Sequence, residues 1–147
     1  MTASGEDRAS FAYLVGRVGQ GVRREMRARL AGHGLSVAEF TALSVLRRRP
    51  GLSNAQLARR AMITPQAMIE VLAELERRGL VRRRADAAHR RVLRAELTPR
   101  GERLLDAAEP PVLALEGELL AGVPDRQRAA VLDALHEAMR RLSTGGD

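Results

Sequence analysis

The sequence predicts a mainly α-helical chain with one small β-hairpin, and three observations predict it. Apolar residues recur three and four positions apart through most of the chain, a spacing that lines one face of a helix. Serine or threonine precedes several of these runs, in the position that caps a helix N-terminus. The spacing changes to every second residue in one place, between residues 81 and 97, as in paired strands.

The first two helices are separated by a glycine-containing link. The first is expected to end near Gly32 to Gly34, and Ser36 and Glu39 form a capping box that begins the second. Pro50-Gly51 ends the second helix. The apolar face of the first helix consists of Phe11, Leu14, Val15, Val18, Val22, Met26 and Leu30.

Two short helices with a tight turn between them follow. Ser53 and Gln56 repeat the capping pattern, and Thr64-Pro65 supplies a cap followed by proline at the first helical position. Gly79 is placed to end the second of these helices in the left-handed conformation. Such a pair is typical of a helix-turn-helix, whose second helix enters the DNA major groove. The apolar residues of that second helix are Met68, Val71, Leu72 and Leu75.

The β-hairpin is expected to form a wing beside this motif. Residues 81–84 and 91–97 are the predicted strands, and residues 86–90 lack the glycine of a tight turn, so an exposed loop is expected. His89, Arg90 and Arg91 would lie at its tip. The inward-facing residues of the second strand are expected to be Leu93, Ala95 and Leu97.

Two further helices are expected to begin at Thr98-Pro99 and Pro124-Asp125. Pro110-Pro111 falls inside the first of them and predicts a kink or a break there. The apolar faces of the first and last helices are longer than a small winged lobe covers, so a second subunit is expected to bury them. Helix packing within one chain is the alternative.

The charge indicates a polyanionic partner. All 25 basic residues are arginine, and the net charge is +7. Ten arginines and three acids lie between Arg77 and Arg103, so this stretch carries the whole excess. Only 2% of the residues are aromatic, whereas sequence-specific readers of single strands stack bases on aromatic rings. Double-stranded DNA is therefore the predicted partner.

The exposed side of the helix that follows Thr64 would read bases. Gln66 suits adenine, Glu70 would accept a hydrogen bond from the cytosine amino group, and Ile69 would pack on a thymine methyl. For Gln66 and Glu70 the alternative is an ordinary solvated surface. The predicted DNA-binding residues are Ser53, Asn54, Arg59, Thr64, Gln66, Ala67, Ile69, Glu70, Arg82, Arg84, His89, Arg90 and Arg91.

The remaining contacts would hold the DNA backbone and the minor groove. Ser53 and Thr64 act first as helix caps, and phosphate contact is compatible with that role. Arg90 or Arg91 would enter a narrow minor groove. The alternative is a solvated hairpin in which Arg91 pairs with Asp86.

The sequence gives less support to other functional classes. Scattered histidines and the absence of cysteine predict no enzyme, cofactor or metal site. Gly16, Gly19 and Gly21 lie inside a helix, where they favour close packing rather than phosphate binding. With no membrane span or export signal, the expected location is cytoplasmic and nucleoid-associated. A general architectural DNA-binding protein and a winged protein-interaction module remain as alternatives.

Four segments together are similar to the multiple-antibiotic-resistance-regulator (MarR) family of bacterial transcription factors. The resemblance lies in Leu57-Ala58, in residues 75–81 (Leu-Glu-Arg-Arg-Gly-Leu-Val), in the wing sequence at residues 89–91, and in Leu-Thr-Pro-Arg-Gly at residues 97–101. Family members commonly have Thr-Arg where this chain has Ile69 and Glu70, and aspartate where it has His89.

The resemblance implies one MarR-like domain over residues 1–147. A winged helix-turn-helix lobe would occupy 36–101, and a helical dimerisation lobe 8–34 and 102–143. The resemblance also implies a homodimer that binds a palindromic DNA sequence, usually as a repressor. It further implies a small aromatic or phenolic effector, and the candidate contacts for this effector are Tyr13, Arg17, His33 and Phe40.

Overall fold

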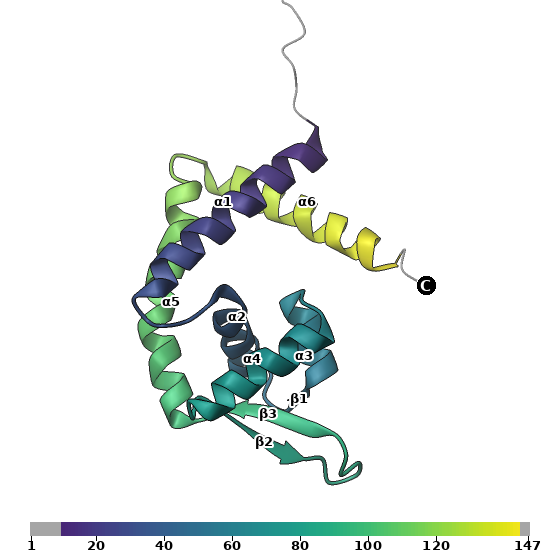
Figure 1. Ribbon diagram of the computed structural model, residues 1–147. Helices are drawn as coiled ribbons and strands as arrows, with labels where there is room; N and C mark the ends of the chain where they lie inside the picture. The colour runs from purple at the N-terminus through teal and green to yellow at the C-terminus, as the bar shows by residue number, and fades with distance from the viewer. Residues whose placement is uncertain (1–9, 145–147) are drawn as a thin grey trace, which may run out of the picture. The chain divides into compact units, whose positions relative to one another are not determined.

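The protein is described by a computed structural model that covers residues 10–144 (Figure 1). The first residues, for which no export signal is predicted, and the predicted start of the helical lobe at residue 8 lie outside the described residues. The chain divides into two compact units, of which the first ends at Leu113 and the second begins at Ala114. In chain order the elements are α1 (Phe11–Ala31), α2 (Val37–Arg48), β1 (Leu52–Ser53), α3 (Asn54–Ala61), α4 (Pro65–Arg77), β2 (Val81–Ala85), β3 (Leu93–Leu97), α5 (Pro99–Leu119) and α6 (Asp125–Thr144).

The predicted helix starts are confirmed by their capping hydrogen bonds. The Ser36 hydroxyl accepts from the Glu39 amide at 3.1 Å, and the Ser36 amide donates to the Glu39 carboxylate at 2.9 Å. Ser53 makes the same reciprocal pair with Gln56 at the start of α3. Each cap satisfies amides that a helix leaves unpaired, so local sequence alone fixes where these helices begin.

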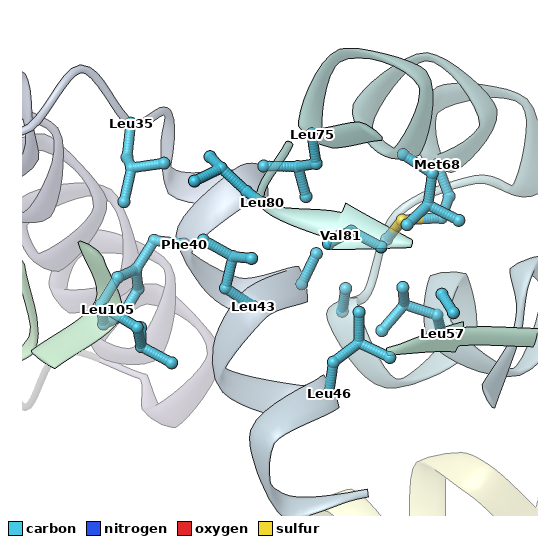
Figure 2. Close-up of a cluster of buried hydrophobic side chains, with 14 of the residues drawn as sticks. Leu35, Phe40, Leu43, Leu46, Leu57, Met68, Leu75, Leu80, Val81 and Leu105 are labelled. Carbon is cyan, nitrogen blue, oxygen red and sulfur yellow. The ribbon is translucent and has the colours of Figure 1, made fainter. Parts of the chain in front are cut away.

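A single apolar core holds the winged part of the first unit together. Helices α2, α3 and α4 and the sheet bury their apolar faces against one another (Figure 2). A fully buried leucine contributes about 1.5–3 kcal/mol through removal of its side chain from water. The largest completely buried side chains are Leu30, Leu43, Leu46, Leu57, Met68, Leu72, Leu75, Leu80, Val81 and Leu105.

The sheet has three antiparallel strands in the order β1-β3-β2. The sequence analysis predicted β2 and β3 but missed β1, which pairs Leu52 with Ala95. The prediction that three residues of β3 point inward is partly wrong. Ala95 is buried and Leu97 packs against the core, but Leu93 is 45% exposed, since it lies at the wing end of the hairpin beyond the core.

The sequence predicted a kink or a break at Pro110-Pro111, and the break is not found, because α5 continues through both prolines. Proline removes amide donors but fixes a φ angle that a helix accepts, so the flanking turns carry the helix on. Arg29 of α1 donates to the Pro111 carbonyl at 2.8 Å, within the first unit. Between residues 10 and 144, no helix combines the length and apolar character needed to cross a membrane.

Candidate nucleic-acid interface

The turn between α3 and α4 is held by the backbone and by one side chain. The Ile63 amide donates to the Ala58 carbonyl at 3.1 Å, and Met62 ends α3 in the left-handed conformation with φ of 57°. The Asn54 side-chain amide donates to the Pro65 carbonyl at 3.0 Å and so links the start of α3 to the start of α4. These contacts fix the crossing of the two helices.

Helix α4 has one buried side and one exposed side. Met68, Leu72 and Leu75 are at most 1% exposed. On the opposite side Gln66 and Glu70 are exposed. The exposed side also carries Ile69, which is 48% exposed, while Ala67 is half-buried. A rigid helix therefore presents two hydrogen-bonding side chains and one apolar side chain to solvent.

The predicted phosphate contacts at the helix ends act as caps in the free protein. The Thr64 hydroxyl oxygen accepts from the Ala67 amide at 3.1 Å, and Ser53 caps α3 in the same way. In each case the oxygen is used as an acceptor, so the hydroxyl hydrogen is available to donate to a phosphate. Arg59 is exposed on α3.

The arginines on the strands form ion pairs with carboxylates. The Nε atoms of Arg82 and Arg84 lie 2.9 Å and 3.1 Å from one carboxylate oxygen of Glu96. Arg83, which the sequence analysis passed over, pairs with Glu76 of α4 at 2.6 Å. The alternating pattern of β2 was the available signal, since it turns Arg83 away from the face of Arg82 and Arg84.

Asp86 organises the wing loop. Its carboxylate accepts from the amides of Ala88 at 2.7 Å and His89 at 3.3 Å and pairs with Arg94. Arg94 in turn donates to the Gly51 carbonyl at 3.0 Å, which ties the loop to the segment before β1. The Ala88 amide and, after it, Arg94 lower the pKa of the Asp86 carboxyl. The side chain is therefore ionised under ordinary conditions.

The alternative in which Arg91 pairs with Asp86 is wrong, because Arg94 takes that place. Arg90 and Arg91 are both exposed, and neither makes an ion pair or side-chain hydrogen bond within the described part of the chain. His89 is exposed beside them. The wing tip therefore carries two free guanidinium groups on an ordered loop.

A groove of about 400 Å³ joins the wing to the start of α3. It brings together three predicted residues, Ser53, Asn54 and Arg91, which are far apart in the sequence. It also includes residues that sequence reasoning did not assign to the site. Its lining consists of Ser53, Asn54, Ala55, Leu72, Arg83, Arg91, Val92 and Leu93.

A larger pocket of about 670 Å³ lies between α1, α2 and the α3–α4 turn. Arg23 is its one charged residue and Thr41 its one hydroxyl. The predicted ligand contacts lie elsewhere: Tyr13 and Arg17 are exposed on α1, His33 follows that helix, and Phe40 is buried in the core. The pocket is lined by Gly19, Val22, Arg23, Met26, Val37, Ala38, Thr41, Ala61, Met62 and Ile63. In residues 10–144 no three histidine or acidic side chains are grouped as metal ligands.

The chain is similar to known proteins in both sequence and structure. A model of the MarR family matches residues 33–92. The HTH-type transcriptional repressor Rv2887 of Mycobacterium tuberculosis is 46% identical over 115 residues, which cover 78% of this chain and 83% of that protein. Its crystal structure in complex with salicylic acid has a TM-score of 0.72 and 42% identity, covering 90% of this chain and 98% of that one.

Two structures that carry the name CouR are also similar. CouR from Rhodococcus jostii RHA1 bound to p-coumaroyl-CoA has a TM-score of 0.82 and 29% identity, covering 92% of this chain and 95% of that one. A transcriptional repressor CouR bound to a 23-mer DNA duplex has a TM-score of 0.81 and 26% identity, covering 95% of this chain and 99% of that one. The similarity therefore extends over most of the chain.

Proposed function

The chain belongs to the MarR family of transcription regulators, and from that premise we propose that it is a repressor rather than an enzyme. It binds a palindromic DNA duplex as a homodimer and releases it when a small aromatic anion binds. The proposed winged lobe is 36–101, and the proposed helical dimerisation lobe is 8–34 with 102–143.

The free arginines of the wing tip carry the DNA-binding proposal. The four arginines on the strands are each ion-paired, whereas Arg90 and Arg91 are exposed and unpaired in the described residues. A narrow minor groove concentrates negative potential, and an unpaired guanidinium enters it without first losing a protein partner. The wing loop is already held in place by its hydrogen bonds to Asp86. Inserting one of its arginines into the groove therefore costs less conformational entropy than it would from a flexible loop.

The exposed side of α4 supplies the sequence readout. Gln66 matches the donor and acceptor pair of adenine, and Ile69 offers an apolar surface to a thymine methyl. Ser53, Thr64 and Arg59 contact phosphates at the flanks. Wing and helix thereby read the minor and major grooves of the same half-site.

DNA binding is tested with the duplex upstream of the chain's own gene and a shuffled duplex of equal length. We expect at least about hundredfold tighter binding to the native duplex. Arg90→Ala is expected to weaken binding to both duplexes, because it removes a cation from the DNA-facing surface, and to reduce the slope of log affinity against log salt concentration by up to about 0.9. Arg24→Ala on α1, also an exposed arginine, is the matched control and leaves affinity unchanged.

The same titration separates the alternatives. Equal, salt-sensitive affinity for both duplexes indicates an architectural DNA-binding protein. Failure to bind either duplex at low salt contradicts the proposal and favours a protein-interaction module.

The exposed apolar faces of two helices support the homodimer. On α1, Phe11 is 61% and Val18 is 59% exposed. On α6, which belongs to the second unit, Leu142 is 81% and Met139 is 58% exposed. Large apolar side chains that are exposed to this extent are typical of a surface that a second subunit covers. Sedimentation equilibrium is expected to give a dimer for the full chain, and a monomer at micromolar concentration contradicts this.

The large pocket of the first unit is the proposed effector site. Its lining is mainly apolar, and Arg23 is exposed with no partner in the described residues. An apolar wall with one cation suits a flat hydrophobic body with a single negative charge. Salicylate, which the Rv2887 structure contains, has this chemistry.

The effector site is tested by calorimetric titration with salicylate. Arg23→Gln is expected to weaken binding by at least about tenfold, because a hydrogen bond to a charged group contributes about 1.5–3 kcal/mol. Arg17→Gln, on the same helix but outside the pocket lining, is the control. If the Arg17 variant loses salicylate and the Arg23 variant retains it, the pocket assignment is wrong.

A further inference from the structure

The carboxylates of the winged lobe are neutralised by arginine with one exception. Within the described residues 36–101, the exception is Glu70, which makes no ion pair and no side-chain hydrogen bond. The ion-paired carboxylates are Glu39 with Arg78, Glu74 with Arg77, Glu76 with Arg83, Asp86 with Arg94, and Glu96 with Arg82 and Arg84.

Glu70 is also held in a fixed position. It is exposed on α4 on the side opposite the buried residues, and its neighbours one turn away are the uncharged residues Gln66 and Ala73 and the carboxylate of Glu74, which is paired with Arg77. The capped start of α4 and the buried residue Met68 prevent the helix from turning the carboxylate elsewhere. The lobe with the greatest excess of arginine therefore presents one unneutralised negative charge, on the helix proposed to enter DNA.

A free carboxylate in a major groove is repelled by phosphates, which lie within the screening length of about 8 Å at physiological ionic strength. A hydrogen bond from a base offsets this cost only where the base offers a donor. In the major groove, cytosine and adenine each present an amino group. Guanine presents only acceptor atoms, and thymine presents one acceptor and a methyl group. Adenine places its N7 acceptor beside its amino group, where it repels an acceptor-only carboxylate.

From these observations we propose that Glu70 is a specificity-determining residue that selects cytosine in each half-site and weakens binding to duplexes that place another base at that position. This inference rests on the proposed DNA-binding function. Gln66 and Glu70 are one helical turn apart, about 6 Å along the axis. Base pairs are about 3.4 Å apart, so the adenine and cytosine they read lie within about two steps of each other.

The test is selection from a duplex library with a randomised core, using wild type, Glu70→Ala and Glu70→Gln. We expect wild type to enrich an inverted repeat with cytosine at one position in each half. Replacing that cytosine lowers wild-type affinity by about five- to 150-fold, the range for one base-specific contact. In Glu70→Ala the preference disappears, and in Glu70→Gln it moves to adenine, which matches the glutamine amide.

Glu74→Gln is the matched control. It removes the same charge from the same helix, but from a carboxylate already paired with Arg77 at 2.6 Å. We expect it to raise affinity for all duplexes without changing the enriched base. Both Glu70 substitutions remove an exposed side chain with no partner in the described residues, so folding is expected to be retained, and circular dichroism checks this.

The outcomes separate this inference from the function on which it rests. If wild type enriches a palindrome whose cytosine preference is unchanged in Glu70→Ala, the role of Glu70 is overturned while the regulator remains. If wild type enriches no sequence at all, the proposed function itself fails.

Discussion

Substitution of Gly101 by alanine tests whether the start of α5 packs closely against the winged lobe. Gly101 lies in the first turn of α5, and a Cβ built on it would be 2.1 Å from the Leu80 carbonyl oxygen and 2.9 Å from Leu97 Cδ2. That carbonyl accepts from the Thr98 amide at 3.1 Å, and Leu80 is 2% exposed. The added methyl group therefore meets backbone that is hydrogen-bonded and buried, and one side must move by about 1 Å.

The expected cost follows from two opposing effects. Forcing a methyl group into packed structure costs about 1–3 kcal/mol, whereas alanine in place of helical glycine gains about 0.5–1 kcal/mol. A net loss of about 1–2 kcal/mol in the free energy of unfolding is expected for Gly101→Ala. Gly16→Ala is the matched control, because Gly16 also lies in a helix and nothing lies within 4 Å of its Cβ position. It should gain about 0.5–1 kcal/mol.

Urea unfolding at one protein concentration measures both variants. The slope of free energy against urea should equal that of wild type, so that the midpoint reports stability alone. Opposite signs for the two substitutions support the close contact at Gly101. Equal stabilisation by both would show that α5 does not approach Leu80 in solution and would refute the reasoning.

Three further outcomes are expected. The pKa of Asp86 lies below its ordinary value of 3.8 because of the Ala88 amide and then Arg94. The contribution of Asp86 to wing stability is therefore complete above pH 3.8 and is lost as the pH falls through the lowered pKa; a carboxyl titration followed by NMR with a midpoint at or above 3.8 contradicts this. Arg47 pairs with three carboxylates of α5 and is 25% exposed, so Arg47→Ala should lower stability by about 1–2 kcal/mol at low salt and by less at 1 M salt. A loss that does not depend on salt would mean that packing, not charge, dominates. Met62 is 81% exposed with φ of 57°, so Met62→Gly should raise stability by up to about 1 kcal/mol in thermal unfolding, and a lower Tm would show that its side-chain contacts matter more than its backbone.

The helices could be predicted because their signals are local. Ser36 and Ser53 act within four residues of themselves, and the observed capping bonds are those the sequence predicted. Strand β1 could not be predicted, since it has two residues and exists only through pairing with β3, some forty residues later. At Pro110 the sequence left a kink and a break as alternatives, and the continuity of α5 decides only against the break.

In the candidate interface, too, some features follow from local sequence and others depend on the tertiary structure. Exposure of Gln66 on α4 follows from helical periodicity, and the exposed wing loop follows from its missing glycine. The partner of Asp86 depends on the register of the hairpin, which pairs Arg84 with Arg94 and so decides which arginine reaches the carboxylate. The sequence analysis named only Arg91 as a possible partner of Asp86. The lining residues of the proposed effector pocket could not be predicted, since they come from three elements that only the fold brings together.

Because the proposed effector pocket shares a wall with the turn before α4, we expect ligand and DNA binding to be interdependent. Ala61, Met62 and Ile63 line the pocket; Ala61 ends α3, and Met62 and Ile63 lie in the turn from which α4 begins. A salicylate that requires a different position of this turn thereby disfavours the α4 position that DNA requires. Linkage makes the effect reciprocal, so DNA must weaken salicylate binding by the same factor by which salicylate weakens DNA binding. Calorimetry with and without saturating duplex measures the first factor and anisotropy the second. Unequal factors would mean that salicylate also binds outside this pocket, and a factor of one in both would mean that the turn does not couple the sites.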